Sequence, residues 1–414
     1  MSEQVGPVVV LGSTGSIGTQ ALDVLSRCAP HVGVEALAAG GNNLGLLASQ
    51  AAATGARVVG VATGSAAQVR AAIEAAEDAA GLPRVEREIL VGPHAAADVA
   101  ACRPDGVVLN GMSGSIGLGP TLAALEAGAD LALANKESLV AGAALVRRAS
   151  RRPGQIRPVD SEHSAMWQAL AAGKHRRGLV AQSVDGSSEV ARLILTASGG
   201  PFRGRSRAEL ANVSAQQALN HPTWDMGPVV TINSSTLMNK ALELIEAHVL
   251  FDVAPERITA VVHPQSVIHS AVEFVDGSTI AQASPPDMCL PIALGLSAPQ
   301  RWAGAAAPCA WDAPVSWTFE PLDEVTFPAV RLARQAVAAS STHPAVFNAA
   351  NEEAVDAFLS GRCGYLEIVD TVQAVLEAWE HPGEPRDLAD VTEVERHARA
   401  AARERLQRNS TSLA

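Results

Sequence analysis

Short runs of apolar and β-branched residues alternate with longer, Ala-rich stretches of helical spacing over residues 7–150. Runs of this length predict buried strands, and the stretches between them predict helices. The expected strands are Val8–Leu11, Val32–Leu37, Arg57–Val61, Ile89–Val91, Gly106–Leu109 and Leu131–Ala134. Because strands that alternate with helices form parallel sheets, the pattern predicts an α/β fold with a Rossmann-like parallel sheet in residues 1–155.

In residues 156–297 the expected helices and strands no longer alternate regularly, which predicts a central α+β domain. An acidic cluster at Asp160 precedes an expected helix over 162–172, and another helix is expected to begin near Ser234. Apolar and polar residues alternate from Val267 to Ala283 on both sides of an Asp-Gly pair, which predicts a β-hairpin in an antiparallel or mixed sheet.

The last part of the chain divides into a connection and a helical region. Residues 298–325 are rich in Ala, Pro and Trp and show little periodicity, which predicts a linker. From Pro328 onward the pattern is helical, so we expect a C-terminal helical bundle over 326–414. A chain of 414 residues is long enough for two or three domains, in agreement with this division.

The composition supports the α/β class and argues against some classes of binding partner. The aromatic residues are 7 Phe, 6 Trp and 1 Tyr, so Ala, Val and Leu must fill the cores, which suits close packing of helices on a sheet. The net charge is −12, and an acidic protein repels phosphate backbones and anionic lipid surfaces. We therefore expect neither nucleic acid nor a membrane as a partner.

The cysteines indicate a reducing compartment. They are widely spaced and include no Cys-x-x-Cys pair, which fits neither a disulfide framework nor a zinc site. The first residues lack the basic region of a signal peptide, and no uncharged apolar run is long enough to span a bilayer. We therefore expect a cytoplasmic protein. The five cysteines are Cys28, Cys102, Cys289, Cys309 and Cys363.

A glycine-rich turn follows the first expected strand and opens a helix, with the sequence GSTGSIG from Gly12 to Gly18. Glycines let the backbone approach a pyrophosphate, and a helix N-terminus offers unpaired N–H groups. The spacing is G-x-x-G-x-x-G, so a nucleotide cradle and a purely structural turn both fit. After the second strand come Gly40, Gly41 and Asn42 rather than a carboxylate, which permits NADP and does not favour NAD.

Two carboxylates, Asp160 and Glu162, follow an apolar strand at positions i and i+2. On an extended segment they would point the same way and could bind one cation that prefers hard oxygen ligands. A third carboxylate would come from Glu243 or Glu246 on an expected helix. The alternative is that Asp160 or Ser161 caps the helix that follows.

Other candidates could hold an anionic substrate. Lys136 follows the sixth expected strand, at the carboxyl edge where open α/β sheets bind ligands, although it could also be a solvated lysine at a helix start. Segments 196–203 and 234–240 combine hydroxyls, amides and a cation, which suits a phosphate monoester. We expect the loop over 218–230, which carries a Trp and a Met, to act as a lid with His221 as a ligand contact.

Eight motifs occur in order along the chain, from about residue 7 to 375. They are GSTGSIG at 12–18, NKE at 135–137, PVDSEH at 158–163, LTASGGPFR at 195–203, HPTWDMG at 221–227, LMNK at 237–240, HPQSVIH at 263–269 and NAANE at 348–352. Together they resemble the motifs of the 1-deoxy-D-xylulose 5-phosphate reductoisomerase family, which serves the methylerythritol phosphate route to isoprenoid precursors.

The resemblance implies an NADPH-binding N-terminal domain, a central catalytic domain that carries the interface of a homodimer, and a C-terminal helical bundle. It implies Mg²⁺ or Mn²⁺ at Asp160, Glu162 and Glu243. The implied nucleotide contacts are Thr14, Gly15, Ser16, Ile17, Gly40, Gly41, Asn42, Asn135, Glu137 and Gly227. The implied substrate contacts are Lys136, Ser161, Glu162, Ser198, His221, Ser234, Asn239, Lys240 and Glu243, with Ser198, Ser234, Asn239 and Lys240 nearest the phosphate.

The implied reaction rearranges 1-deoxy-D-xylulose 5-phosphate and reduces the product with NADPH to 2-C-methyl-D-erythritol 4-phosphate. A divalent cation would polarise the ketone and stabilise the negative charge that forms on oxygen. The implied catalytic residues are Lys136, Asp160, Glu162 and Glu243. Among them, Lys136 and Glu162 are the candidates for moving protons.

Three places depart from the family's pattern. Pro228 and Val229 stand where a basic residue is usual, Asn233 stands for an Asp, and Gly41 stands where a Lys is common. Two alternatives stay open: another NADP-linked oxidoreductase for phosphorylated substrates, and a non-catalytic protein that kept the fold. Three carboxylates argue against both, because simple hydride transfer does not need them and a protein without a cation would gain from losing their repulsion.

Overall fold

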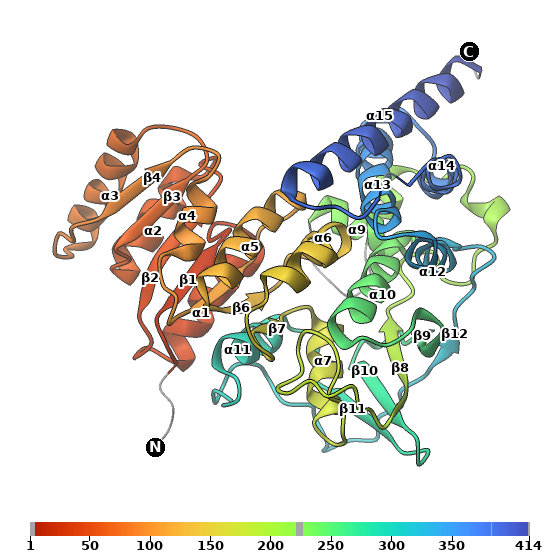
Figure 1. The fold of residues 1–414 in the computed structure, drawn as a ribbon, viewed down its shortest axis with the longest axis horizontal. Coiled ribbons are helices and arrows are strands. Elements are labelled where there is room, and N and C mark those ends of the chain that lie inside the picture. The colour runs from red at the N-terminus through yellow and green to blue at the C-terminus, as the bar shows by residue number, and fades with distance from the viewer. Residues whose placement is uncertain (1–4, 221–226, 382, 413–414) are drawn as a thin grey trace.

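The computed structural model describes residues 5–220, 227–381 and 383–412. The N-terminal part of this chain forms a parallel sheet in the strand order β4-β3-β2-β1-β5-β6-β7 (Figure 1). The strands are β1 (Val8–Leu11), β2 (Val34–Ala39), β3 (Val58–Val61), β4 (Glu88–Val91), β5 (Val107–Asn110), β6 (Asp130–Leu133) and β7 (Ile156–Pro158). The helices between them are α1 (Ser16–Cys28), α2 (Leu44–Thr54), α3 (Ala66–Ala80), α4 (Ala95–Ala101), α5 (Leu118–Ala127) and α6 (Glu137–Ala149).

The first sheet confirms the predicted α/β class, and each of the six expected strands lies within two residues of its observed bounds. The strand order reverses between β1 and β5, which is the switch point where open α/β sheets bind ligands. At the other end of the sheet, β7 pairs in parallel with β6 so that Pro158 lies opposite Leu133. The chain therefore leaves both strands at the same edge, just before Lys136 and Asp160.

Both faces of the first sheet are buried, which explains why its strands are continuous apolar runs. Val8 and Val10 point into one core, and Val9 and Leu11 point into the other. The first core is completed by α11 (Cys289–Ser297), a helix far along the chain that packs against α1 and buries Ile292. The sequence offers no local sign of this contact, because α1 ends at Cys28 and α11 begins only at Cys289.

The second sheet has the order β11-β10-β8-β9-β12 and is mixed. Strands β8 and β9 are parallel, whereas β10 pairs antiparallel with β8 and β11, and β12 pairs antiparallel with β9. The predicted hairpin is confirmed, with its turn at Asp276 and Gly277. The strands are β8 (Val190–Ala197), β9 (Ile258–Val262), β10 (Ile268–Phe274), β11 (Thr279–Ala283) and β12 (Glu320–Pro321).

Among the helices of the central part are α7 (Ser161–Leu170), α9 (Pro228–Ser235) and α10 (Met238–Phe251). Two of them, α7 and α10, pack on the second sheet. The expectation that one helix begins near Ser234 is wrong, because Ser234 lies in the last turn of α9 and a new helix begins at Met238. The break falls at Leu237, whose φ of 60° lies in the left-handed region and cannot continue a helix.

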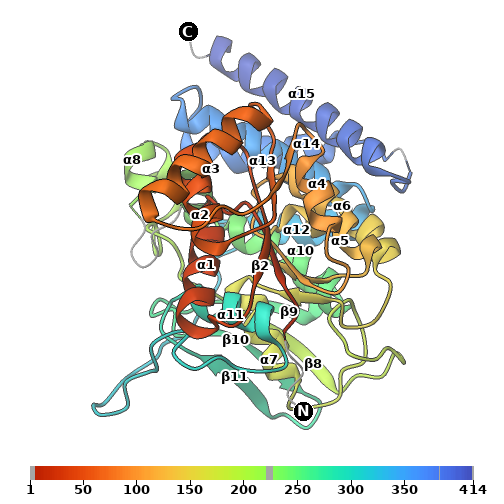
Figure 2. The same ribbon diagram turned by 90° about the vertical axis from the view of Figure 1, so that its left-hand side faces the viewer.

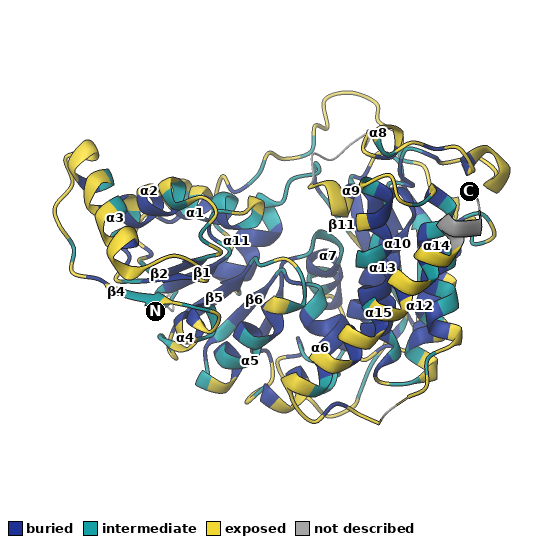
Figure 3. Ribbon diagram, turned by 90° about the horizontal axis from the view of Figure 1, so that it is seen from above, coloured by how far each residue is buried: buried dark blue, intermediate teal, exposed yellow. Residues whose placement is uncertain are grey.

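The C-terminal part is helical, as predicted, and follows a stretch over 298–319 without helix or strand. Figure 2 shows α15 lying along the outside of the molecule, and Figure 3 shows that α10 and α13 are largely buried in the half that lies at the right of that view. Within the described residues, no helix is long and apolar enough to cross a membrane. The helices are α12 (Ala329–Ala339), α13 (His343–Leu359), α14 (Tyr365–Glu377) and α15 (Leu388–Ser412).

The glycine turn after β1 gives a test of the fold. A Cβ on Gly18 would lie 2.3 Å from the backbone oxygen of Gly12, whereas a Cβ on Gly45, in α2, would meet nothing within 4 Å. We expect Gly18→Ala to lower the free energy of unfolding by about 1–3 kcal/mol, because the backbone must shift. Gly45→Ala should raise it by up to about 1 kcal/mol. Equal denaturant midpoints for the two variants would show that the turn is not tightly packed.

Candidate active site

Asp160 lies directly after β7 and caps α7. Its Oδ1 accepts hydrogen bonds from the backbone N–H groups of Glu162 at 3.0 Å and His163 at 3.3 Å, while its Oδ2 forms an ion pair with Lys136. The cap and the candidate ligand are thus compatible, because they use different oxygens. The expectation of an extended segment is wrong: the cap turns the chain, so that Glu162 stands in the first turn of the helix.

Three polar side chains share one face of α10, with spacings of four and three residues. They are Asn239, Glu243 and Glu246, and Asn239 donates from Nδ2 to Glu243 Oε1 at 2.6 Å. The side chain of Glu243 is 1% exposed. Asp160, Glu162 and Glu243 each bring a carboxylate oxygen to a position within 4.8 Å of the others. The structure therefore unites residues that lie 83 positions apart at their extremes.

Two lysines neutralise much of this negative charge. Lys136 Nζ lies 3.2 Å from Glu243 Oε1 and 3.7 Å from Glu246 Oε2. Lys240 Nζ lies 3.5 Å from Glu162 Oε1 and forms a second ion pair with Glu243. Burial lowers the pKa of each lysine, but the carboxylates outweigh burial and hold the pKa above its ordinary value. Both lysines therefore remain charged.

The carboxyl groups of the site differ in their protonation. Burial raises the pKa of Glu162 to about 8 and the pKa of Glu246 to about 7. Burial acts in the same direction on Asp160, but Lys136 and His163 outweigh it and hold the pKa of Asp160 well below its ordinary value. Near neutral pH, Asp160 is therefore ionised and Glu162 carries a proton.

His163 belongs to the cluster, although the sequence reasoning assigned it no role. Its Nε2 lies 2.8 Å from the backbone oxygen of Glu243, which can only accept, so Nε2 carries a proton. Its Nδ1 lies 3.2 Å from Asp160 Oδ1 and 3.8 Å from Glu246 Oε2. Burial lowers the pKa of His163, but Asp160 and Glu246 raise it to about 9. The spacing of three residues from Asp160 at a helix start was the signal that could have revealed this contact.

Two sets of side chains within the described ranges could hold a cation, one of Asp160, Glu162 and Glu243 and the other of Asp160, His163 and Glu246. The first set offers three carboxylate oxygens, which are the hard ligands that Mg²⁺ and Mn²⁺ prefer. The second includes a protonated imidazole, which has no lone pair to donate. The donor chemistry therefore favours the first set.

The glycine turn lies at the switch point of the first sheet. Gly12 has a φ of 73°, and the N–H groups of Gly12 and Ser13 both donate to the backbone oxygen of Ala38 in β2, at 2.8 and 3.0 Å. Gly15 is the N-cap residue of α1, and no side chain caps that helix. Because the N-terminal N–H groups of α1 have no side-chain cap, the turn can receive a phosphate. Thr14, Ser16 and Ile17 belong to the same turn and first helical residues.

Asn135 links the nucleotide side of the sheet to the cation side. It is buried, and its Nδ2 donates to the backbone oxygens of Met112 at 3.0 Å and Gly114 at 2.9 Å and to Glu137 Oε2 at 2.8 Å. These bonds fix the loop after β5 above the start of α6. Lys136, the next residue, reaches the carboxylate cluster, so the two predicted regions adjoin.

The second predicted nucleotide segment, Gly40 to Asn42, follows β2. Gly41 has a φ of 103°, and a Cβ there would lie 2.7 Å from Thr63 Oγ1 and 2.9 Å from the Thr63 backbone oxygen. A lysine therefore does not fit at position 41, which accounts for that departure from the family's pattern. Thr63 in turn donates from Oγ1 to the backbone oxygen of Gly40 at 3.0 Å.

The two segments that suit a phosphate meet in space. The loop after β8 contains Ser198, whose Oγ accepts from the N–H of Gly200 at 3.3 Å. A Cβ on Gly200 would lie 2.9 Å from the backbone oxygen of Ser234, at the end of α9. Asn239 and Lys240 follow in the first turn of α10, so the four residues expected nearest the phosphate come from adjacent loops and helix ends.

The expected lid lies only partly within the described residues. His221, Trp224 and Met226 fall outside them, so the structure does not place the predicted contact of His221. The lid's flanks are α8 (Ala215–Ala218) and α9, for which Gly227 is the N-cap residue.

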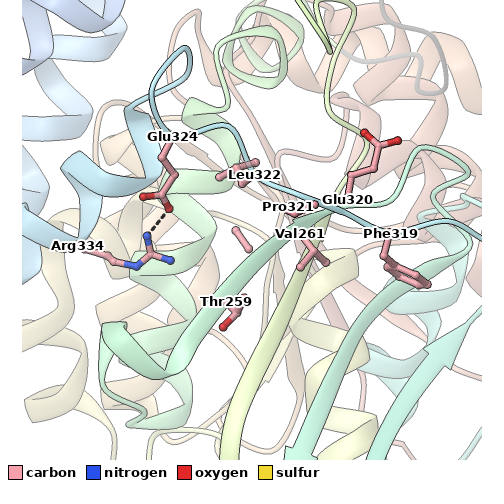
Figure 4. Close-up of a pocket in the computed structure, with 9 residues that line it drawn as sticks. Thr259, Val261, Phe319, Glu320, Pro321, Leu322, Glu324 and Arg334 are labelled. Atoms are coloured by element: carbon pink, nitrogen blue, oxygen red, sulfur yellow. Dashed lines mark hydrogen bonds and ion pairs between the residues drawn. The ribbon is translucent and has the colours of Figure 1, made fainter.

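A groove on the second sheet takes no part in this arrangement. It is lined by residues of β9 and β12, and Figure 4 shows an ion pair between Glu324 and Arg334 within it. Glu324 Oε1 lies 2.6 Å from Arg334 Nη1. Its lining includes Val261, Phe319 and Leu322. None of the residues that line it is among the predicted site residues.

Comparison with known proteins shows to which family the chain belongs. Three family models match the chain: 1-deoxy-D-xylulose 5-phosphate reductoisomerase at residues 8–143, its C-terminal domain at 156–251, and the DXP reductoisomerase C-terminal domain at 283–401. Over 397 residues the chain is 62% identical to the 1-deoxy-D-xylulose 5-phosphate reductoisomerase of Beutenbergia cavernae, with 96% of each chain covered. The chain belongs to the 1-deoxy-D-xylulose 5-phosphate reductoisomerase family.

Solved structures of the reductoisomerase family share the fold. The enzyme from Zymomonas mobilis in complex with NADPH superposes with a TM-score of 0.85 at 38% identity, covering 97% of this chain and 99% of that one. A DOX-P reductoisomerase in complex with NADPH, fosmidomycin and magnesium also gives a TM-score of 0.85, at 32% identity, with 97% and 98% covered. Family membership and the three-part fold thus confirm the resemblance inferred from the motifs.

The raised pKa of Glu162 makes cation binding pH-dependent. Because Glu162 carries a proton near pH 7 and a ligand must be ionised, Mn²⁺ binding should release a proton and tighten by up to about tenfold per pH unit from pH 6 to 8. Isothermal titration calorimetry in two buffers of different ionisation enthalpy measures this release. Glu162→Gln should remove the release and weaken binding at least about tenfold.

Glu246→Gln is the matched control for this titration. Glu246 is also a buried carboxyl with a raised pKa, but it belongs to the set that contains His163. Mn²⁺ should therefore bind this variant with nearly unchanged affinity. A larger loss in Glu246→Gln than in Glu162→Gln would place the cation in the other set.

Proposed function

We propose that this chain converts 1-deoxy-D-xylulose 5-phosphate into 2-C-methyl-D-erythritol 4-phosphate, with NADPH as reductant and Mg²⁺ or Mn²⁺ as cation, in isoprenoid precursor biosynthesis. One observation carries the proposal: Asp160, Glu162 and Glu243 converge at the carboxyl edge of a sheet whose first turn is a glycine cradle. Family membership supports it, as do the NADPH and magnesium named for the solved relatives.

The proposed division of labour follows the three parts of the chain. Residues 1–155 bind the nucleotide, 156–297 carry the catalytic residues, and 298–325 connect them to the helical region 326–414. Strand β7 and α11 belong by sequence to the central part but pack on the first sheet, so they hold the catalytic residues against the nucleotide region.

NADPH would lie across the switch point of the first sheet. The pyrophosphate fits the cradle at the start of α1, and the nicotinamide then reaches toward Asn135 and the cation site. No described residue at Gly40 to Asn42 is a cation, so the ribose 2′-phosphate would be held by polar and backbone groups there. The proposed nucleotide contacts are Thr14, Gly15, Ser16, Ile17, Gly40, Gly41, Asn42, Asn135, Glu137 and Gly227.

The substrate would lie between the cation ligands and the phosphate segments. When bound, a divalent cation polarises the substrate's carbonyl and stabilises negative charge on its oxygen. The carboxylates then need less neutralisation from Lys136 and Lys240, and both ammonium groups become available to the anionic substrate. The proposed substrate contacts are Lys136, Ser161, Glu162, Ser198, His221, Ser234, Asn239, Lys240 and Glu243.

Two residues are placed to manage protons. Lys136 holds its proton firmly, because its pKa lies well above the ordinary value, so it acts as a hydrogen-bond donor to a substrate oxygen. Glu162, with a pKa of about 8, exchanges a proton near neutral pH. Ser161 donates to Glu162 Oε2 at 2.6 Å and orients that carboxyl group. Glu162 gives up its proton when a cation binds, so we assign the role of proton donor at the substrate to Lys136 and that of proton acceptor to the ionised Glu162.

We also propose a cytoplasmic homodimer. None of the five cysteines, all of them in described parts of the chain, forms a disulfide, which supports a reducing compartment. Strand β11 pairs only with β10 among the described strands, and it exposes Ile280, while Val275 in the turn between the two strands is also exposed. An unpaired edge with apolar side chains is suited to association with a second copy.

The reaction is tested by the absorbance of NADPH at 340 nm with Mn²⁺ and 1-deoxy-D-xylulose 5-phosphate. Asp160→Asn should lower kcat at least about 100-fold, because it removes a ligand charge shared by the cluster. Glu126→Gln, at an exposed position of α5, is the control and should keep full activity. NADPH oxidation that needs no divalent cation would instead favour a simple oxidoreductase. A folded protein that binds NADPH without turnover would contradict the proposed reaction.

The proposed dimer is tested by light scattering after size-exclusion chromatography. Ile280→Lys places a charge on the exposed edge of β11 and should shift the protein from dimer to monomer. Leu82→Lys adds the same charge at an exposed site beyond α3 in the first domain and should leave the dimer intact. A wild-type protein that elutes as a monomer at micromolar concentration would refute the homodimer.

A further inference from the structure

Both neighbours of Ser234 in the sequence are tied to the C-terminal helices. Asn233 Oδ1 accepts a hydrogen bond from Asn351 Nδ2 of α13 at 3.0 Å. The backbone oxygen of Ser235 accepts a hydrogen bond from Tyr365 Oη, at the start of α14, at 2.6 Å. Ser235 and Asn351 are fully buried, and Tyr365 is 3% exposed. The backbone at Ser234 is therefore held from both sides, by bonds that water does not weaken.

The ring of Tyr365 supports the other phosphate segment as well. Phe202, four residues after Ser198, packs edge-to-face on Tyr365 with ring centroids 5.2 Å apart and an angle of 81°. Gly200, between them, comes so close to Ser234 that an added Cβ would lie 2.9 Å from its backbone oxygen. One side chain from the C-terminal region thus contacts the Ser198 loop through its ring and the end of α9 through its hydroxyl.

The hydroxyl of Tyr365 distinguishes this contact from ordinary packing of aromatic rings. A phenylalanine at position 365 would supply the same ring packing with Phe202, and Phe358 on the other side packs on the ring at 5.7 Å. Tyr365 is the only tyrosine of the chain, and its buried hydroxyl has a defined partner in Ser235. At position 233 the amide oxygen of Asn233 accepts the bond from Asn351, a role that an Asp could also fill, so this contact does not explain the departure from the family's pattern.

We propose that Tyr365 and Asn351 are positioning residues for the substrate's phosphate group, acting through the Ser198 loop and the backbone at Ser234. This inference rests on the proposed function, in which those two serines bind the phosphate. Hydrogen bonds to a phosphate depend on the placement of each donor, and a small displacement weakens them. The C-terminal helices therefore contribute to substrate affinity, although none of their residues is proposed to contact the substrate.

Tyr365→Phe is the main test, because it removes the hydroxyl and leaves the ring in place. We expect the KM for 1-deoxy-D-xylulose 5-phosphate to rise about three- to tenfold, in keeping with the loss of one buried hydrogen bond. The KM for NADPH and kcat should stay within about twofold of the wild type. Asn351→Leu, which keeps the branching of the side chain and removes its polar atoms, should give the same pattern.

Ile368→Val is the matched control. Ile368 is fully buried in the same helix and the same apolar cluster as Tyr365, but it makes no polar contact with α9. Thermal unfolding should show a comparable loss of stability, with no change in the KM for the substrate. A double variant, Tyr365→Phe with Ser198→Ala, should raise KM by less than the product of the two single effects, because both act on one phosphate.

The outcomes separate the two proposals. Wild-type protein without turnover would refute the proposed function. Active wild type with an unchanged substrate KM in Tyr365→Phe would overturn the positioning role, as would an equal rise of the substrate and NADPH KM values. An equal rise in substrate KM for Ile368→Val would also overturn it. If Asn351→Leu does not fold, Tyr365→Phe decides alone.

Discussion

Buried carboxylates must be neutralised, and this requirement organises the centre of the molecule. Asp160, Glu162, Glu243 and Glu246 lie close together in a largely water-free space, where unpaired charges would cost several kcal/mol each. Two lysines and a protonated histidine offset them. In the proposed function, Glu162 gives up its proton when a divalent cation binds, and the cation takes over from the lysines part of the neutralisation of Asp160, Glu162 and Glu243.

The first sheet brings the proposed cofactor and cation sites close together. Its strands all end at one edge, and the glycine turn, Asn135 and Asp160 follow β1, β6 and β7 along that edge. Asn135 holds the loop after β5 on one side, while the next residue, Lys136, reaches the carboxylates on the other. Hydride donor and polarised carbonyl must approach within contact distance, and neighbouring parallel strands provide that proximity without a long connecting loop.

The C-terminal helices give the site its rigidity. Helices α13 and α14 supply Asn351 and Tyr365, which hold the end of α9. Helix α10 is almost fully buried and packs on α12 and on the second sheet. The break at Leu237 lets Ser234 and Asn239 lie in different helices and face the same region. In one continuous helix, the rise per residue would fix the distance between Ser234 and Asn239 along the helix axis. The left-handed conformation of Leu237 breaks the helix and so helps to place these two residues.

The sequence by itself determined the strands of the first sheet, the hairpin and the family, because apolar periodicity, turn residues and ordered motifs are local signals. It also indicated the three carboxylates, since hard ligands near a strand end suggest a cation. It could not choose between Glu243 and Glu246 or between cap and ligand for Asp160. Only the tertiary structure brought Glu243 together with Asp160 and Glu162, showed that Asp160 caps α7 with one oxygen and pairs with Lys136 through the other, and revealed the contacts of His163 and Tyr365. Which oxygens converge depends on how distant helices pack.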